Sequence, residues 1–227
     1  KHQVPALCDE INSRGEFLTG YCGDTYSDHG KMQAIFEYTS MMGELLDADV
    51  VSYTNYDGGQ AVSSSLRIAL RVMRSRNTPK SVLLVPSTMN PEIFAQAREY
   101  CRSEGRIDKV AYERETGLMD LKDLEERLKS GDVAAVFYEN PSYLGFFETR
   151  GEKIAELAHK YGALCIAQPE VAALGVMESP MNQGADLVCG DIQPLGMHIQ
   201  YGGGQAGFIA CQQDVELIRE FPTYMYG

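Results

Sequence analysis

The sequence lacks the features that mark a nucleic-acid or membrane protein. Its 227 residues carry 20 lysines and arginines against 32 aspartates and glutamates, a formal net charge of −12, with no basic stripe to bind phosphate backbones. No apolar run approaches the roughly 18 residues of a membrane span, and the first residues do not read as a signal peptide. We therefore expect neither nucleic acid nor a membrane as a partner.

Motifs for several kinds of chemistry are also missing. The six cysteines are scattered without a CxxC pair, so their spacing supports no metal site, and a reducing cytoplasm is the expected location. Cys165, Cys189 and Cys211 lie in apolar runs and are expected to be small buried residues. No GxxxxGK[ST], GxGxxG or GxSxG pattern occurs, which leaves nucleotide binding and serine hydrolysis without a motif.

What is present predicts a layered α/β fold. With 44% hydrophobic and 23% charged residues, the composition is typical of a globular domain. Continuously apolar strands alternate with helical segments, a pattern typical of a parallel sheet covered by helices on both faces. We expect a three-layer, mostly parallel α/β sheet in one domain over residues 1–227. Because Lys1 is not a methionine, we also expect this domain to be a portion of a longer chain.

The alternation predicts individual elements. The expected strands are 81–85, 110–113, 134–139, 163–167, 186–189 and 207–211, and the expected helices are 31–46, 60–74, one opened by Asn90 and Pro91, one around 121–128, and 151–161. VSYTNYDGG, between the first two helices, is expected to be a loop. Apolar residues at helical spacing in the first helix are expected to pack in the core: Met32, Ile35, Phe36, Met42, Leu45 and Leu46.

Ligands of open parallel sheets bind beyond the carboxyl ends of the strands. Tyr56, Asp57 and Gly58 open a helix at that edge, so their backbone amides could hold an anion such as a cofactor phosphate. A second candidate cofactor-binding stretch at the same edge consists of Gly202, Gly203 and Gly204. The plain interpretations are a helix cap for the first stretch and a tight entry to the next strand for the second. No catalytic residue is predicted.

The most informative segment is 185–208, ADLVCGDIQPLGMHIQYGGGQAGF, which has the pattern strand, turn, glycine cluster, strand. In pyridoxal-phosphate enzymes of the aspartate aminotransferase type, such a segment carries the lysine that forms a Schiff base with the cofactor. No lysine follows Lys160 in this chain. If the architecture is of that type, the missing lysine points to a partner subunit that holds the reactive centre.

Several stretches in this order resemble the first, alpha-type subunit of the two-chain glycine decarboxylase, the P-protein of the glycine cleavage system, also called glycine dehydrogenase (decarboxylating) subunit 1. They are FLTGY, GKMQAIFEYTSMMGEL, YDGGQA, NPSYLGFFE, IAELAHKYGAL, and GADLVCGDIQPLG followed by YGGGQAGF. The last pair is the most specific, because it is typical of the subunit without the reactive lysine. Gln193 falls about where the sister subunit places its Schiff-base lysine.

The resemblance implies the large domain of a fold-type-I pyridoxal-phosphate-dependent enzyme. It implies a glycine dehydrogenase (aminomethyl-transferring) that works as a heteromer, in which this chain alone is inactive. Pyridoxal phosphate is expected mainly on a lysine-bearing second P-protein subunit, with no Schiff-base lysine in this chain. Glycine is then the substrate, and the aminomethyl group passes to the lipoyl H-protein. Gln168 stands where a cofactor-binding relative carries an aspartate for the pyridine nitrogen.

Two alternatives stay open. Residues 22–27 depart from the family pattern, which suggests a catalytically dead paralogue that acts as a scaffold or regulator. A different pyridoxal-phosphate enzyme would need an unorthodox lysine. Lys80 and Lys109 are expected at strand starts, away from the binding edge, so we rank this alternative last.

Overall fold

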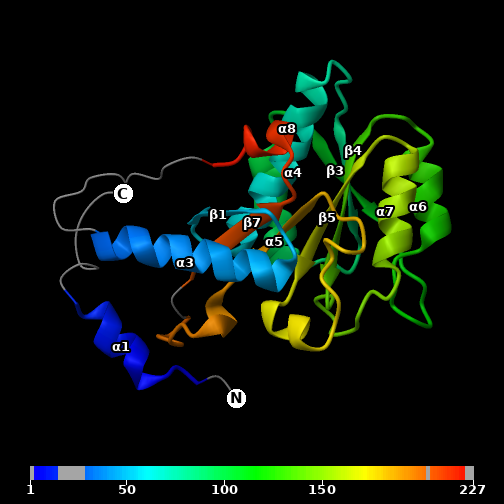
Figure 1. Cartoon of the computed structure of the whole chain (residues 1–227). Coiled ribbons are helices and arrows are strands. Elements are labelled where there is room, and N and C mark those ends of the chain that lie inside the picture. Colours follow the sequence, from blue (N-terminus) through cyan, green and yellow to red (C-terminus); the bar gives the residue numbers. More distant parts are fainter. Residues whose placement is uncertain (1–2, 15–28, 203–204, 223–227) are drawn as a thin grey trace.

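The structure is a computed structural model that describes residues 3–14, 29–202 and 205–222. These residues form a seven-stranded sheet in the order β1-β7-β6-β5-β4-β2-β3 (Figure 1). Its strands are β1 Val50–Asn55, β2 Val82–Pro86, β3 Arg106–Val110, β4 Val133–Asn140, β5 Leu164–Pro169, β6 Leu187–Asp191 and β7 Gly207–Cys211. β7 is antiparallel to both of its neighbours, and the pairs from β6 to β3 are parallel. The expected mostly parallel sheet is confirmed.

Helices flank this sheet on both sides (Figure 1). On one side α4 (Gly58–Ser75) packs on β6 and β7 and against α5 (Pro91–Cys101), and on the other α7 (Gly151–Lys160) packs on β4 and β5 beside α6 (Leu121–Leu128). α3 (His29–Leu46) contacts β1. The short elements are α1 (Ala6–Asn12), α8 (Val215–Ile218), η1 (Val171–Gly175) and η2 (Gln193–Leu195). Among the described residues, no helix is long and apolar enough to cross a membrane.

The sequence explains why the buried strands and helix α5 form where they do. Every residue of β2, β4 and β7 is buried, in agreement with their continuous apolar runs. The side chain of Asn90 accepts a hydrogen bond from the amide of Glu92, and proline occupies the first turn of α5. The three cysteines expected in the core are buried free thiols, which confirms that prediction.

The loop predicted for VSYTNYDGG is wrong in its first half, because Val50–Asn55 form strand β1. β1 pairs with β7, which lies more than 150 residues further along the chain, as in the pair Val50↔Cys211. Its serine, threonine and asparagine interrupt the apolar run, so the local pattern did not indicate a strand. α1 was also not predicted, because it buries no residue.

The strand predicted at 110–113 is misplaced, because β3 spans Arg106–Val110. Within the described sheet β3 is an edge strand that pairs only with β2. Arg106 and Lys109 are exposed there, and such charges are common on edge strands. These two charged residues interrupt the apolar pattern that indicates a buried strand. The strand was therefore predicted at the next apolar residues along the chain, 110–113.

The core packing predicted for the first helix is correct for only part of its stripe. Met42 and Leu46 are buried, but Met32 is 46% exposed and Phe36 is 67% exposed. Leu45 is also exposed. The amino-terminal end of α3 extends away from the sheet (Figure 1), and Leu45 is exposed on a different side of the helix from the buried Leu46. Periodicity identified the apolar residues but not how far the sheet reaches beneath them.

Candidate functional site at the carboxyl ends of the strands

Parallel strands end at one edge of the sheet, and the loops that follow them meet there. We call this edge the rim, and define it as residues 55–59, 87–90, 139–147, 168–170 and 191–202. They follow or end β1, β2, β4, β5 and β6. The candidate residues Tyr56, Asp57, Gly58 and Gly202 belong to the rim, whereas Gly203 and Gly204 lie outside the described residues.

The amino terminus of α4 is closed by two carboxylates of this chain. Asp57 Oδ1 accepts a hydrogen bond from the Gln60 amide at 2.6 Å, and Asp191 Oδ2 accepts one from the Gly58 amide at 3.1 Å. Asp191 Oδ1 also accepts from the Gln193 amide at 2.6 Å. The positive end of a helix attracts anions, and here internal carboxylates take that place. An incoming phosphate would therefore meet negative charge at this end.

Two glycines allow this close arrangement. A Cβ on Gly58 would lie 3.0 Å from the Cβ of Asp191, and a Cβ on Gly207 would collide with the backbone carbonyl of Asp57. Gly207 opens β7, so the returning chain lies directly against the turn that starts α4. Sequence reasoning missed Asp191 and Gly207, because their partner is more than 130 residues away along the chain.

The other candidates differ in surroundings. Tyr56 is 62% exposed, and its amide donates to Gln60 Oε1 at 3.0 Å. Gly202 is exposed, with a φ of +140° that favours glycine. That Tyr56, Asp57, Gly58 and the glycine cluster contact a cofactor stays a prediction.

Four buried side-chain oxygens on the rim have no hydrogen-bond partner within the described part of the chain. They are Asn55 Oδ1, Ser87 Oγ, Ser142 Oγ and Gln168 Oε1. Buried polar groups are nearly always hydrogen-bonded, and leaving one unpaired costs about 1–3 kcal/mol. Because the four oxygens lie at one edge, they indicate a site that another group completes.

Glu139 organises the middle of the rim. Its carboxylate accepts hydrogen bonds from the amides of Asn90 at 3.1 Å and Tyr143 at 3.2 Å, so it joins the loops after β2 and β4. Burial raises the pKa of Glu139 above its usual range. Gln168 is its direct neighbour on β5, so an unpaired amide oxygen lies beside this carboxyl group.

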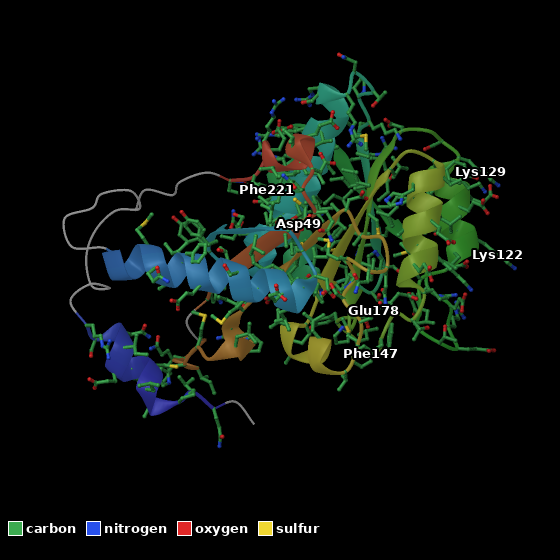
Figure 2. The ribbon with its side chains drawn as sticks, viewed as in Figure 1. Asp49, Lys122, Lys129, Phe147, Glu178 and Phe221 are labelled. Carbon is green, nitrogen blue, oxygen red and sulfur yellow. The ribbon has the colours of Figure 1, made fainter. Side chains whose placement is uncertain are left out.

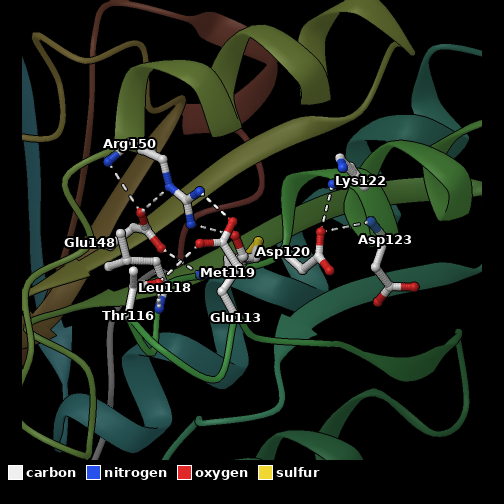
Figure 3. Close-up of polar contacts among 9 residues, drawn as sticks. All are labelled: Glu113, Thr116, Leu118, Met119, Asp120, Lys122, Asp123, Glu148 and Arg150. Atoms are coloured by element: carbon white, nitrogen blue, oxygen red, sulfur yellow. Dashed lines mark hydrogen bonds and ion pairs between the residues drawn. The ribbon is translucent and has the colours of Figure 1, made fainter.

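The loop after β4 is held by a buried ion pair (Figure 3). Glu148 Oε2 accepts from the Met119 amide at 2.8 Å, and its Oε1 lies 3.3 Å from Arg150 Nε. Arg150 also donates to Glu113 Oε1 at 2.8 Å and to the Met119 carbonyl at 2.6 Å. The side chain of Asn140 accepts from the backbone amide of Glu148 and donates to its carbonyl. The loop is therefore fixed at its far end.

This fixed loop presents apolar side chains outward. Tyr143 is 57% exposed and Leu144 62%, and Phe147 lies at the periphery of the molecule (Figure 2). Further along the rim Leu195 and Ile199 are exposed as well. Exposed apolar groups gathered on the loops of one sheet edge are typical of interaction surfaces. The rim therefore combines unpaired polar atoms with an apolar border.

The two lysines considered as alternatives fall outside the rim ranges defined above, although Lys109 is the last residue but one of β3. Lys80 Nζ donates to the carbonyls of Tyr161 and Gly162, beyond the amino end of β2. The prediction that Lys109 lies at a strand start is wrong, because β3 begins at Arg106. Its ammonium group lies 4.1 Å from the ring centre of Phe94.

Pyridoxal phosphate does not fit the described residues of this chain taken alone. Its phosphate would face Asp57 and Asp191 at the amino terminus of α4. None of the rim ranges contains a lysine, and the neutral amide of Gln168 supplies no carboxylate for a pyridine nitrogen. The rim can therefore accept hydrogen bonds and bury apolar groups, but it does not offer a complete cofactor site.

Comparisons with known proteins agree with the fold. A sequence model of the family described as Glycine cleavage system P-protein matches residues 1–227. A relative from Aeropyrum pernix, named Probable glycine dehydrogenase (decarboxylating) subunit 1, is 40% identical over 227 residues, which cover 99% of this chain and 48% of the relative. A relative of the same name from Staphylothermus marinus is 37% identical, and this chain covers 48% of that relative's length. The chain thus spans about half the length of these relatives.

Solved structures show the same architecture. An inhibitor-bound crystal structure of glycine decarboxylase (P-protein) of the glycine cleavage system matches with a TM-score of 0.84 and 32% identity, over 97% of this chain and 48% of that one. A sphingosine-1-phosphate lyase from Burkholderia pseudomallei matches with a TM-score of 0.72 at 14% identity, over 95% of this chain and 52% of that one, and shows the fold alone. The fold-type-I prediction is confirmed.

Proposed function

The chain belongs to the glycine cleavage system P-protein family, and from this premise we propose that it is part of the non-lysine subunit of glycine decarboxylase. It would support decarboxylation of glycine by a lysine-bearing second subunit, with transfer of the aminomethyl group to the lipoyl H-protein. Three features of the rim together carry the proposal: it contains no lysine, carboxylates close its helix terminus, and four buried oxygens there are unpaired in the described residues. A partner that holds the cofactor would explain all three features.

Pyridoxal phosphate, when bound, supplies an electron sink for the carboxylate loss, and we place it on the partner. The residues of this chain would act around it. Asn55, Ser142 and Gln168 accept or share hydrogen bonds with donors that the partner brings, and the apolar rim loops exclude water. Glu139 keeps two loops in register for that contact. Tyr56, Asp57, Gly58, Gly202, Gly203 and Gly204 would border the partner's cofactor rather than bind its phosphate from this chain alone.

A cytoplasmic location is part of the same proposal. Cys101, Cys165, Cys189 and Cys211 are all buried as free thiols, which is typical of a protein in a reducing compartment.

The relatives' shared name favours a working subunit over a catalytically dead scaffold.

The test incubates the purified chain with pyridoxal phosphate, reduces it with borohydride and maps any adduct by mass spectrometry. The same treatment is applied to the chain paired with the lysine-bearing subunit. We expect no site-specific adduct on this chain in either case, and one on the partner. Stoichiometric labelling of one lysine of this chain would contradict the proposal.

Activity gives the second readout. Release of labelled carbon dioxide from glycine, measured with lipoyl H-protein, is expected only when both subunits are present. Release by this chain alone would contradict the proposal. Equal release by the second subunit with and without this chain would instead favour the scaffold alternative.

A further inference from the structure

One side of α3 displays a row of apolar residues that the rest of the chain covers only in part, since Tyr38 packs against the core while Met41 and Leu45 are exposed. Ala34, Tyr38, Met41 and Leu45 are spaced four, three and four residues apart, so they lie on the same side of the helix. Met41 is 65% exposed and Leu45 38%. We call these four residues the α3 face. Single exposed apolar side chains are ordinary, but a continuous row along a helix marks a contact surface.

A hollow of about 300 Å³ adjoins the amino-terminal part of the α3 face. Its lining includes Ala34, Ile35 and Tyr38 of α3 together with Tyr53, Ile192 and Ala206. The hydroxyl oxygen of Tyr38 is buried and has no hydrogen-bond partner among the described residues. Burial, and to a lesser extent the nearby Asp191, raises the pKa of Tyr38 to about 12, so the hydroxyl stays a neutral donor at physiological pH. The hollow is therefore mostly apolar, and the Tyr38 hydroxyl on its wall lacks a partner within the part of the chain that the structure describes.

The charges around the α3 face indicate which occupant fits. Glu37 and Glu44 stand four residues before and three residues after Met41, so they flank the α3 face, whereas Asp47 and Asp49 border a second hollow on another side of the helix. Figure 2 shows Asp49 in this region. The whole chain carries a net charge of −12. A second copy of this chain would bring like charges together, whereas a partner with lysines or arginines beside its apolar residues would be attracted.

The row also indicates the shape of the occupant. Residues four and three positions apart form the ridges and grooves by which two helices pack. An amphipathic helix laid in an apolar groove buries such a row and reaches the hollow beside it.

We propose that the α3 face is the docking surface for an amphipathic helix of the lysine-bearing second subunit, with basic residues beside the apolar stripe of that helix. The inference rests on the proposed function, because that proposal supplies the identity of the partner. The partner helix covers Met41 and Leu45, fills the hollow and supplies a hydrogen-bond partner for Tyr38. Docking through α3 then brings the second subunit to the adjoining rim loop 191–202.

The test measures the dissociation constant between the purified chain and the purified second subunit by isothermal titration calorimetry. Met41→Lys places a like charge against the proposed basic residues and removes apolar contact, so we expect affinity to fall at least about tenfold. Met41→Glu removes the same contact but supplies an attracted charge, so it should lose less. Val215→Lys on α8 is the matched control, because Val215 is 55% exposed on another element, and its affinity should be unchanged. Circular dichroism checks that each variant is folded.

The outcomes separate this inference from the proposed function. Met41→Lys binding as tightly as the unsubstituted chain would overturn the α3 contact while leaving subunit pairing intact. Failure of the unsubstituted chain to bind the second subunit at all would contradict the proposed function as well. Self-association of the chain that Met41→Lys abolishes would make a second copy the occupant and would also overturn the inference.

Discussion

Replacing Arg150 by methionine tests how the rim loop after β4 is held in place. The side chain of Arg150 is 19% exposed and that of its partner Glu148 is 7% exposed, so the pair lies largely out of water. Methionine keeps much of the arginine's apolar length but removes its charge and its donors. The variant leaves Glu148 as a buried carboxylate without a cation, and leaves the Met119 carbonyl without the 2.6 Å hydrogen bond.

The magnitude follows from these contacts. Breaking a buried ion pair by removing one partner typically costs about 3–5 kcal/mol. Glu148 keeps hydrogen bonds from the backbone amides of Met119 and Arg150, which places the cost near the lower limit. The third partner, Glu113, is exposed and adds little. We therefore expect Arg150→Met to lower the free energy of unfolding by about 3 kcal/mol.

Urea unfolding followed by circular dichroism measures this change. Arg102→Met is the matched control, because Arg102 and Glu99 form an ion pair at the carboxyl end of α5 whose side chains are 75% and 62% exposed. It should change stability by less than about 1 kcal/mol. The double variant Glu148→Gln with Arg150→Met should cost less than the sum of the single changes, since no unpaired carboxylate remains. Equal losses for Arg150→Met and Arg102→Met would refute the assignment of a buried anchoring pair.

Two further predictions concern the rim. Because burial raises the pKa of Glu139 above the ordinary 4.5, its contribution to stability is fully present below pH 4.5 and is lost as pH rises through the raised value. Glu139→Gln should therefore flatten the fall in the free energy of unfolding above pH 4.5, measured by urea titrations across pH, and an unchanged slope would contradict the burial argument. Gly207→Ala should lower stability by about 1–3 kcal/mol, because its Cβ meets the Asp57 carbonyl. Gly175→Ala is its control, since a Cβ there meets nothing within 4 Å, and similar thermal unfolding of the two variants would refute the predicted collision.

Local patterns were sufficient for the central strands and helix starts. β2, β4 and β7 are buried along their whole length, so a continuous apolar run predicted them directly. The edge strands were harder, because β1 and β3 each have only one strand neighbour in the described sheet and tolerate polar residues. The stability of an edge strand depends on a partner far along the chain, which a local pattern does not contain.

The same limit applies to the candidate site. The sequence YDGG indicated that a helix starts near Asp57, and the structure has that cap. It did not indicate that Asp191 closes the same helix end, because that contact exists only once β6 is placed beside α4. Likewise the spacing of apolar residues in α3 identified an amphipathic helix, but not that Phe36 and Leu45 stay exposed while Met42 and Leu46 are buried.

The position of Asp191 shows how the helix end at the rim is satisfied from within this chain. A helix amino terminus at the carboxyl edge of a sheet favours an anion, whichever molecule supplies it. In this chain the anion is a side chain from the end of β6, so folding itself satisfies the helix and no cofactor phosphate is needed there. The unpaired oxygens of Asn55, Ser142 and Gln168 differ, because folding leaves them without partners in the described residues. Within the described residues the rim is therefore satisfied at its helix end and incomplete at its strand ends, as the proposed pairing with a second subunit requires.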